Sequence, residues 1–225
     1  MYCAVPTVLV MMQPDFGTAF VFICIMVFIY FIGRISWGYI LTAAGGLAVC
    51  MPLAYYFVLS DSQRERIDVF INPESDLQNS GYNVAQSKIA IGSGQLTGKG
   101  FFSEGTLAQL RFVPERHTDF IFAGIVEGLG FVGGTIIICL FFALIFRWIY
   151  IAMRTKDSFG TCLVVGVAGM FTAHVFENIG MTIGLMPVTG IPLPFISYGG
   201  SNLLTNLIGV GIVENVWMRR QSKKR

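Results

Sequence analysis

The chain has 225 residues, of which 54% are hydrophobic and only 12% are charged. Soluble domains carry about a quarter charged residues, so this composition excludes an ordinary soluble globule and favours a membrane protein. The formal net charge of +2 is too small to indicate binding to nucleic acid, and no nucleic-acid partner is expected.

Five apolar stretches predict an all-α polytopic membrane protein with about five full transmembrane helices. At 1.5 Å per residue, about 20 residues cross a hydrocarbon core of about 30 Å. Residues 1–12 are apolar but too short to span, so only the stub of a helix is expected there. The five stretches are residues 16–32, 37–59, 120–146, 159–186 and 203–218.

The distribution of basic residues predicts how these helices are oriented. Lys and Arg near helix ends collect on the cytoplasmic side of a membrane. The whole of 1–225 is then one multi-pass membrane domain, with residue 1 and the long loop 60–118 outside and the basic tail 219–225 inside. The basic residues of the short connections and the tail are Arg34, Arg147, Arg154, Lys156, Arg219, Arg220, Lys223, Lys224 and Arg225.

The long loop 60–118 has helical periodicity in "RERIDVFINPE" and "GYNVAQSKIAIGSG". Both stretches predict short amphipathic helices that lie at the membrane surface. The glycine-rich "IGSGQLTGKGFF" that follows does not have the glycine spacing of a nucleotide-binding loop. Two readings stay open: a flexible turn between surface helices, or a loop near an anionic ligand with Lys99 as a point charge.

Charged residues cluster where the third long apolar stretch begins, in "FVPERHTDFIFAGIVEG". Charges at such depth are expensive and need a reason beyond solubility. Asp119 is placed to cap the N-terminus of the helix, where a carboxylate is stabilised. Glu127 follows about two turns later on the same face. Two carboxylates descending one helix predict a hydrophilic cleft.

Further polar residues occur inside the next apolar stretches. His174 and Glu177 share a helix face at spacing i, i+3, which fits either a metal pair or a hydrogen bond between helices. The last helix is expected to carry Asn202, Asn206, Glu214 and Asn215. Intramembrane polar groups face a cavity or the bundle interior, so the helices are expected to surround something wet. The segment "PVTGIPLPFISYGGS" cannot continue a helix and predicts a shaped outer lid.

With these motifs, the chain resembles the SEDS proteins (shape, elongation, division and sporulation), the family of RodA, FtsW and SpoVE. The amino-acid sequences of these motifs are closer to those of the RodA branch than to those of the FtsW branch. The matching pieces cover nearly the whole chain in the order of the family. They are "QPDFGTA", "GYNVAQSKIAIGSG", "LTGKG", "FVPERHTDFIFA" and "NIGMTIGLMPVTGIPLPFISYGGS".

This resemblance implies a peptidoglycan glycosyltransferase that polymerises lipid II into glycan strands during cell elongation and shape maintenance. The expected location is the bacterial cytoplasmic membrane, with the active face extracytoplasmic. The expected partners are a class B penicillin-binding protein, which crosslinks the strands, and other members of the elongation or division complexes. The essential aspartate of the family matches Asp119.

The implied chemistry needs a base for a sugar hydroxyl and positive charge for a lipid pyrophosphate. Asp119 is the expected catalytic residue, as the base or as the ligand of a divalent cation, Mg²⁺ or Mn²⁺, the one cofactor that would fit. Any single cation near it is as readily explained by pairing with loop carboxylates. The expected substrate-binding residues are Lys88, Lys99, Arg111, Glu115, Arg116 and Glu127.

Two departures from the family bear on this interpretation. The chain reads "EGLG" where members commonly read "EELG", so Glu127 is kept and Gly128 replaces a second acid. By analogy with the family, about four N-terminal helices precede the part matched here, so the chain is expected to be inactive alone. The alternatives are a lipid II flippase, against which the absence of a visible repeat counts, and a non-catalytic scaffold of the cell-wall complex.

Overall fold

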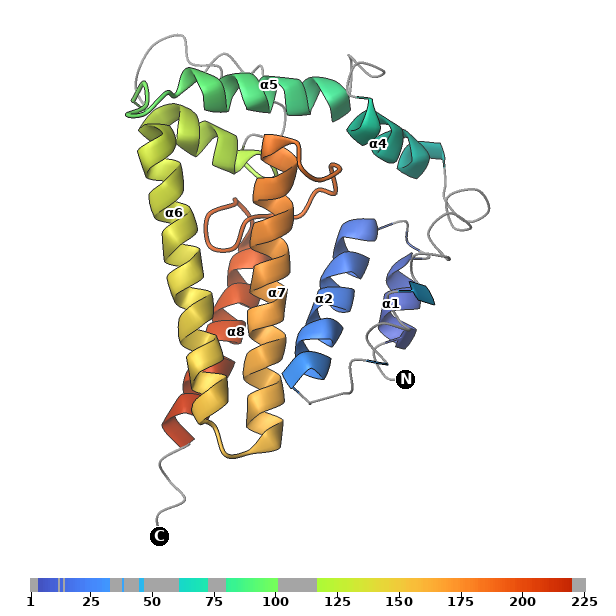
Figure 1. The fold of residues 1–225 in the computed structure, drawn as a ribbon, viewed down its shortest axis with the longest axis vertical. Coiled ribbons are helices and arrows are strands. Elements are labelled where there is room, and N and C mark those ends of the chain that lie inside the picture. Colours follow the sequence, from blue (N-terminus) through green and yellow to red (C-terminus); the bar gives the residue numbers. More distant parts are fainter. Residues whose placement is uncertain are drawn as a thin grey trace.

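The structure is a computed structural model in which every secondary-structure element of the described residues is helical (Figure 1). This agrees with the predicted all-α class. The helices are α1 (Ala4–Met11), α2 (Phe16–Ile32), α4 (Asp61–Ile71), α5 (Ser80–Ser93), α6 (Ile121–Arg154), α7 (Ser158–Ile183) and α8 (Gly200–Arg219). The described residues are 4–11, 13, 15–32, 38, 45–46, 61–72, 80–100 and 117–219.

Two of the described helices, α6 and α7, are long and apolar enough to cross a membrane, with mean hydropathy of 2.6 and 1.7 in their best windows. α2 is a shorter apolar helix, and α1 occupies the position expected for the stub. The second predicted crossing, 37–59, lies outside the described residues except for a few isolated positions, and the last, 203–218, lies within α8. The helical, membrane-type character is thus confirmed, while the number of crossings stays a prediction.

α7 is the central helix of the bundle, because α2, α6 and α8 all pack against it (Figure 1). Its start is fixed by Asp157, whose carboxylate accepts a hydrogen bond from the Gly160 amide at 3.0 Å. Its end is fixed by Gly184 in the left-handed conformation, with φ of 78°. Its lower half is held by an apolar core in which Trp148 of α6 meets Phe171 of α7 edge to face at 4.7 Å.

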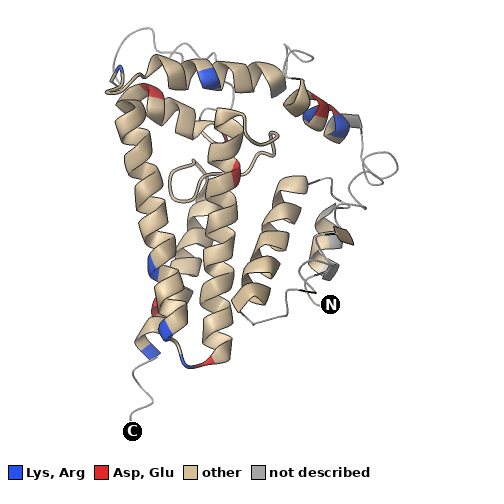
Figure 2. Cartoon of the chain, in the orientation of Figure 1, with Lys and Arg blue, Asp and Glu red and all other residues tan. Residues whose placement is uncertain are grey.

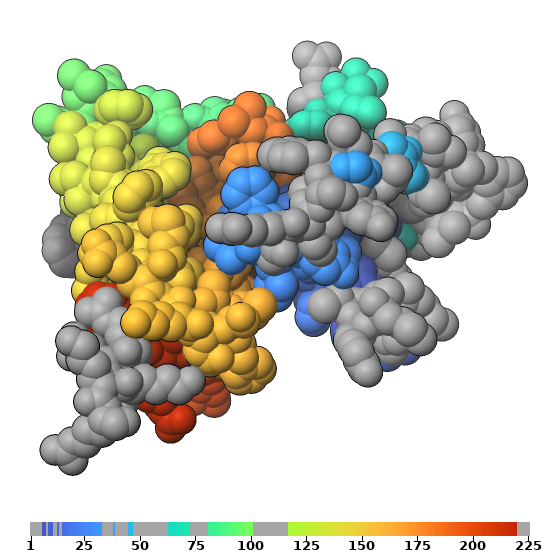
Figure 3. Space-filling model, turned by 60° about the horizontal axis from the view of Figure 1, so that its bottom comes forward, coloured from blue at the N-terminus to red at the C-terminus, as the bar shows by residue number. Residues whose placement is uncertain are grey.

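The chain's charges gather at the two ends of the bundle (Figure 2). The lower end carries three of the described basic residues. Arg154 ends α6, Lys156 lies in the turn between α6 and α7, and Arg219 ends α8. Figure 3, with that end turned forward, shows α6 and α7 as one continuous surface with α8 at its edge. This asymmetry is the pattern on which the predicted orientation rests.

α4 and α5 lie across the upper end of the bundle, where the surface helices of loop 60–118 were predicted (Figure 1). α5 contacts both α6 and α7, so it covers the ends of these helices. Buried Ser87 of α5 donates its hydroxyl to the carbonyl of Thr182, near the end of α7, at 2.8 Å. The upper end is therefore covered by polypeptide along one side.

α6 bends sharply at Gly130, whose φ of 72° and ψ of −173° are not helical. The segment before the bend runs across the upper end of the bundle, and the segment after it descends (Figure 1). The expectation that Asp119 and Glu127 descend one straight helix face is therefore wrong. Both residues precede the bend, so they are separated along the upper end and not in depth.

Candidate functional site

The turn 117–119, which immediately precedes α6, is tied to the segment 184–199 by buried hydrogen bonds. Asn178 of α7 is fully buried, and its side-chain amide donates to the carbonyls of Asp119 and Ile191, both at 2.8 Å. A single amide thus holds two segments of irregular backbone together. Such backbone needs partners of this kind wherever it is buried in a bundle.

Ser197 and Tyr198 attach the other side of the same turn. The hydroxyl of Ser197 donates to the carbonyl of Thr118 at 2.7 Å and accepts from the amide of Leu193 at 2.7 Å. The amide of Tyr198 donates to the carbonyl of His117 at 2.9 Å. The segment predicted to be a shaped lid is therefore the support on which Asp119 is positioned.

The Asp119 carboxylate is half-buried and lies against Gly190. A Cβ on Gly190 would be 3.5 Å from Asp119 Oδ2, and the φ of 79° at Gly190 is one that glycine adopts readily. The expected helix cap is not formed by Asp119, because the N-cap residue of α6 is Phe120. Asp119 stands one residue outside that position, so its carboxylate does not cap α6.

A polar cavity of about 290 Å³ lies beside Gly190, between α2, α4, α7 and the segment 184–199. It agrees with the expectation that the helices surround something wet. Within the described part of the chain, Glu177 Oε2 and His174 Nδ1 are buried and have no hydrogen-bond partner. The residues that line the cavity are Asp15, Thr18, Arg66, His174, Thr189, Gly190, Ile191 and Pro192.

None of these lining residues was among the predicted catalytic and substrate-binding residues, and two of them, Asp15 and Arg66, carry a charge. Asp15 immediately precedes α2. Its carboxylate accepts hydrogen bonds from the backbone amide of Thr18 at 3.0 Å and from the Thr18 hydroxyl at 2.6 Å. Arg66 of α4 donates to the carbonyl of Val188 at 3.3 Å. Asp15 lies within the quoted motif "QPDFGTA", which was the available signal, whereas nothing local distinguishes Arg66 from its charged neighbours.

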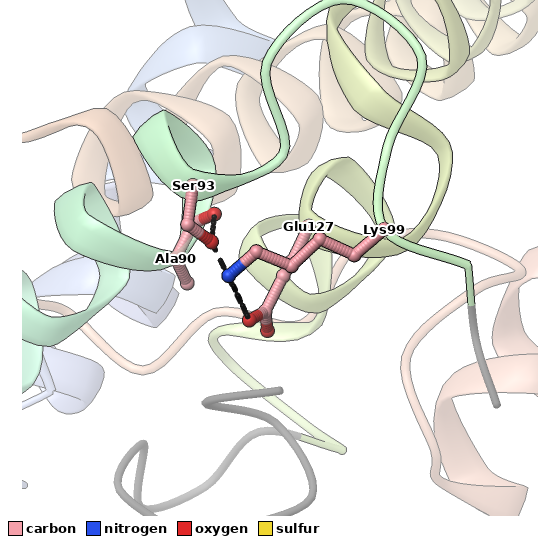
Figure 4. Close-up of polar contacts among 4 residues, drawn as sticks. All are labelled: Ala90, Ser93, Lys99 and Glu127. Carbon is pink, nitrogen blue, oxygen red and sulfur yellow. Dashed lines mark hydrogen bonds and ion pairs between the residues drawn. The ribbon is translucent and has the colours of Figure 1, made fainter. Parts of the chain in front are cut away.

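Glu127 and Lys99 form a second polar group near the bend of α6 (Figure 4). Glu127 is 1% exposed, and its Oε1 lies 3.8 Å from Lys99 Nζ and 3.4 Å from the hydroxyl of Ser93. Lys99 is 41% exposed, so the pair joins a buried carboxylate to a cation at the surface. The structure thus brings together two of the predicted substrate-binding residues, but as partners of each other.

The glycine-rich segment 94–100 is bound to α6 through its backbone, while a role for Lys99 near an anionic ligand stays a prediction. The amides of Lys99 and Gly100 donate to the carbonyls of Glu127 and Gly128 at 3.0 and 2.9 Å. The amide of Phe131 donates back to the carbonyl of Gln95 at 2.8 Å. The segment therefore supplies partners for the polar backbone groups that the bend at Gly130 releases.

The remaining predicted site residues lie elsewhere. The Lys88 side chain reaches over Gly184, the C-cap residue of α7, where a cation is stabilised by the negative end of the helix dipole. This placement favours a structural role for Lys88. Arg111, Glu115 and Arg116 lie outside the described residues.

No cluster of three or more His, Cys, Asp or Glu side chains that could hold a metal ion occurs in the part of the chain that the structure describes. Among these residues, neither Asp119 nor the pair of His174 and Glu177 belongs to such a cluster. Both interpretations of the pair, a metal pair and a hydrogen bond between helices, stay predictions.

Comparison with known proteins gives consistent matches along nearly the whole chain. The pattern of the FTSW_RODA_SPOVE family, described as cell cycle proteins, matches residues 1–222. Peptidoglycan glycosyltransferase MrdB of Escherichia coli K12 is 44% identical over 216 residues, covering 96% of this chain and 58% of MrdB. Stage V sporulation protein E of Bacillus subtilis is 42% identical over 215 residues, covering 92% of this chain and 56% of that protein.

Solved structures agree with this result. A chain of a peptidoglycan synthase complex, studied for its coordination of polymerization and crosslinking, superposes with a TM-score of 0.78 at 30% identity over 98% of this chain and 62% of its own. The rod shape determining protein RodA of Thermus thermophilus gives a TM-score of 0.62 at 28% identity over 96% of this chain and 53% of its own. The chain thus spans a little more than half the length of the proteins that it matches.

Proposed function

Because the chain belongs to the FtsW/RodA/SpoVE family of cell cycle proteins, we propose that it carries the active site of a peptidoglycan glycosyltransferase. The substrate is lipid II, which the enzyme polymerises into glycan strands during cell elongation and shape maintenance. The observation that carries this proposal is the Asp119 carboxylate, which the hydrogen bonds of Asn178 and Ser197 position against Gly190, next to a polar cavity.

Asp119 is the general base of this proposal. It accepts the proton of a sugar 4-hydroxyl, whose oxygen forms a bond to the anomeric carbon of the lipid-linked sugar as the bond from that carbon to the pyrophosphate breaks. Gly190 leaves free the space that a side chain would take beside Oδ2, so a hydroxyl can approach there. The lipid pyrophosphate leaves with the electron pair of the broken bond.

Arg66 is the cation that we assign to the leaving pyrophosphate. It lines the cavity beside Gly190, and its guanidinium has donors beyond the one bonded to Val188. Lys88 and Lys99 are engaged at Gly184 and Glu127, so neither is assigned this role. Arg111, Glu115 and Arg116 remain predicted substrate-binding residues.

A divalent cation, Mg²⁺ or Mn²⁺, would be held here mainly by the phosphate oxygens of the substrate. Mg²⁺ characteristically binds through one or two carboxylates, water and substrate phosphates, which is compatible with Asp119 as a sole protein ligand. No step above requires it. The proposal also places the active face outside the bacterial cytoplasmic membrane, next to a class B penicillin-binding protein and other members of the elongation complex.

The test is an assay of fluorescent lipid II polymerisation by a chimera in which this chain replaces the matched part of E. coli MrdB, supplied with its transpeptidase partner. The chain alone is assayed in parallel, with and without EDTA. We expect the chimera to make glycan and its Asp119→Asn variant to lose at least about a hundredfold in rate, as removal of a general base does. The matched control is Asp68→Asn, an exposed residue of α4, which should leave the rate unchanged.

Each other outcome points to a different function. Equal rates for the chimera and its Asp119→Asn variant would refute the base assignment. Movement of lipid II across vesicles without polymer would favour the flippase. Partner binding without either activity would favour the scaffold. Activity of the chain alone would show that the part matched here is sufficient.

A further inference from the structure

The lower end of α6 carries a cationic and aromatic group of residues that the proposed function does not use. The Arg147 guanidinium carbon lies 4.7 Å from the ring centroid of Trp217 on α8 and 5.8 Å from that of Tyr150. Arg154, two turns further on, lies 5.1 Å from the same Tyr150 ring. We call Arg147, Tyr150, Arg154 and Trp217 the Arg147 cluster.

An open groove of about 570 Å³ runs along α6 directly above this cluster. It is lined by Phe142, Ala143, Phe146, Arg147 and Tyr150. Phe142 and Phe146 are 69% and 73% exposed, and the small Ala143 leaves a hollow between them. Exposed rings one turn apart, with a cation at the end of the row, match an acyl chain that continues into a charged head group.

Neither arginine of the cluster forms an ion pair with a carboxylate among residues 4–11, 15–32, 61–72, 80–100 and 117–219. Two acidic residues lie at this end of the bundle. Asp157 uses its carboxylate on the Gly160 amide, and Glu214 is exposed on α8. A guanidinium that lies near aromatic rings keeps N–H donors, which suit the oxygens of a phosphate. The cluster therefore presents two guanidinium groups, neither in a close ion pair with a described carboxylate, beside an apolar groove.

We propose that the Arg147 cluster and the groove above it form a binding site for an anionic phospholipid such as phosphatidylglycerol. Arg147 and Arg154 bind the phosphate, and one acyl chain lies along Phe142, Ala143 and Phe146. A zwitterionic lipid can fill the groove, but its choline cation opposes the two arginines. Basic pockets between transmembrane helices recognise anionic head groups in this way, and aromatic residues are common at the same depth.

Native mass spectrometry of the whole chain, purified in detergent with phosphatidylglycerol and phosphatidylcholine added together, tests this site. We expect the chain to retain phosphatidylglycerol in preference. Since one basic residue at a membrane surface contributes about 1 kcal/mol to anionic lipid binding, Arg147→Gln and Arg154→Gln should each weaken retention about fivefold. Phe146→Ala should weaken the retention of both lipids.

Three comparisons make the result decisive. Arg64→Gln, on α4 at the opposite end, should retain phosphatidylglycerol as the unchanged chain does. Arg154 lies over Tyr150 of its own helix, so its variant reports on binding even if Arg147→Gln disturbs the contact with Trp217 on α8. Equal retention of the two lipids by the unchanged chain would overturn the proposal. So would a preference that survives both arginine variants but is lost when Lys223, Lys224 and Arg225 are changed to Gln, since the tail would then be the site.

Discussion

Asn178 shows how one side chain fixes the geometry of the candidate site. Its side-chain amide donates hydrogen bonds to the backbone carbonyls of Asp119 and Ile191. No neighbouring turn of helix can supply these bonds, because both acceptors lie in irregular backbone. The position of the Asp119 carboxylate over Gly190 is therefore a consequence of a residue on α7, not of α6 itself.

Asn178→Ala should thus lower both stability and activity. Each buried carbonyl that loses its donor costs about 1–3 kcal/mol, so we expect a loss of about 2–3 kcal/mol in unfolding free energy. Chemical denaturation in detergent measures this quantity. Asn215→Ala, the same substitution at an exposed position of α8, should cost less than about 0.5 kcal/mol. Equal costs for the two variants would refute the role given to Asn178.

Glu127 illustrates a buried carboxylate that depends on a cation from a distant segment. Lys99→Met removes the cation that lies 3.8 Å from Glu127 Oε1. We expect Lys99→Met combined with Glu127→Gln to be more stable than Lys99→Met alone, because the double variant no longer buries a carboxylate that has lost a nearby cation. Since Lys99 is partly exposed, the coupling in a double-mutant cycle should be about 1 kcal/mol. Additive single effects would contradict this account.

At the scale of elements, the bend of α6 decides which end of the bundle carries the site. A Cβ on Gly130 would lie 2.4 Å from both the amide nitrogen of Gly98 and the carbonyl oxygen of Leu96. The left-handed φ at Gly130 therefore occurs at the same place where the segment 94–100 packs closely against α6. Both depend on the absence of a side chain at this position.

Gly130→Ala should separate the segment 94–100 from α6 and destabilise the protein by at least about 2 kcal/mol, through overpacking and backbone strain together. Amide hydrogen exchange at Gln95 to Gly100 should rise in parallel. The control is Gly124→Ala, also in α6, where a Cβ meets nothing within 4 Å and helix propensity should raise stability by up to about 1 kcal/mol. A similar response of both variants would show that the bend tolerates a side chain.

The bend also marks the limit of what the sequence could predict. Hydropathy located the apolar helices α2, α6 and α7 well, because the bilayer imposes their length and composition. It could not reveal the bend, since "EGLGFVGG" continues an apolar run and a single φ angle leaves no periodic signal. Arg66 was missed for a related reason: its place beside the cavity follows from how α4 crosses the bundle, which local sequence does not encode.

At the scale of the whole molecule, the two ends of the bundle have separate chemistry. The upper end carries irregular, hydrogen-bonded backbone, the polar cavity and Asp119, under the cover of α4 and α5 (Figure 1). The lower end carries basic and aromatic residues, as the positive-inside rule describes for a cytoplasmic face (Figure 2). A lipid-linked sugar with its pyrophosphate at the upper surface would reach Asp119 without entering the bundle.

Cysteine labelling tests this orientation directly. In a chain whose own cysteines are replaced by alanine, Thr97→Cys at the upper end and Lys156→Cys at the lower end introduce single exposed thiols. A membrane-impermeant maleimide added to intact spheroplasts should label Thr97→Cys, and it should label Lys156→Cys only after the membrane is opened. The opposite pattern would place Asp119 on the cytoplasmic side. Because lipid II polymerisation is expected outside, that result would also remove the physical basis of the proposed reaction.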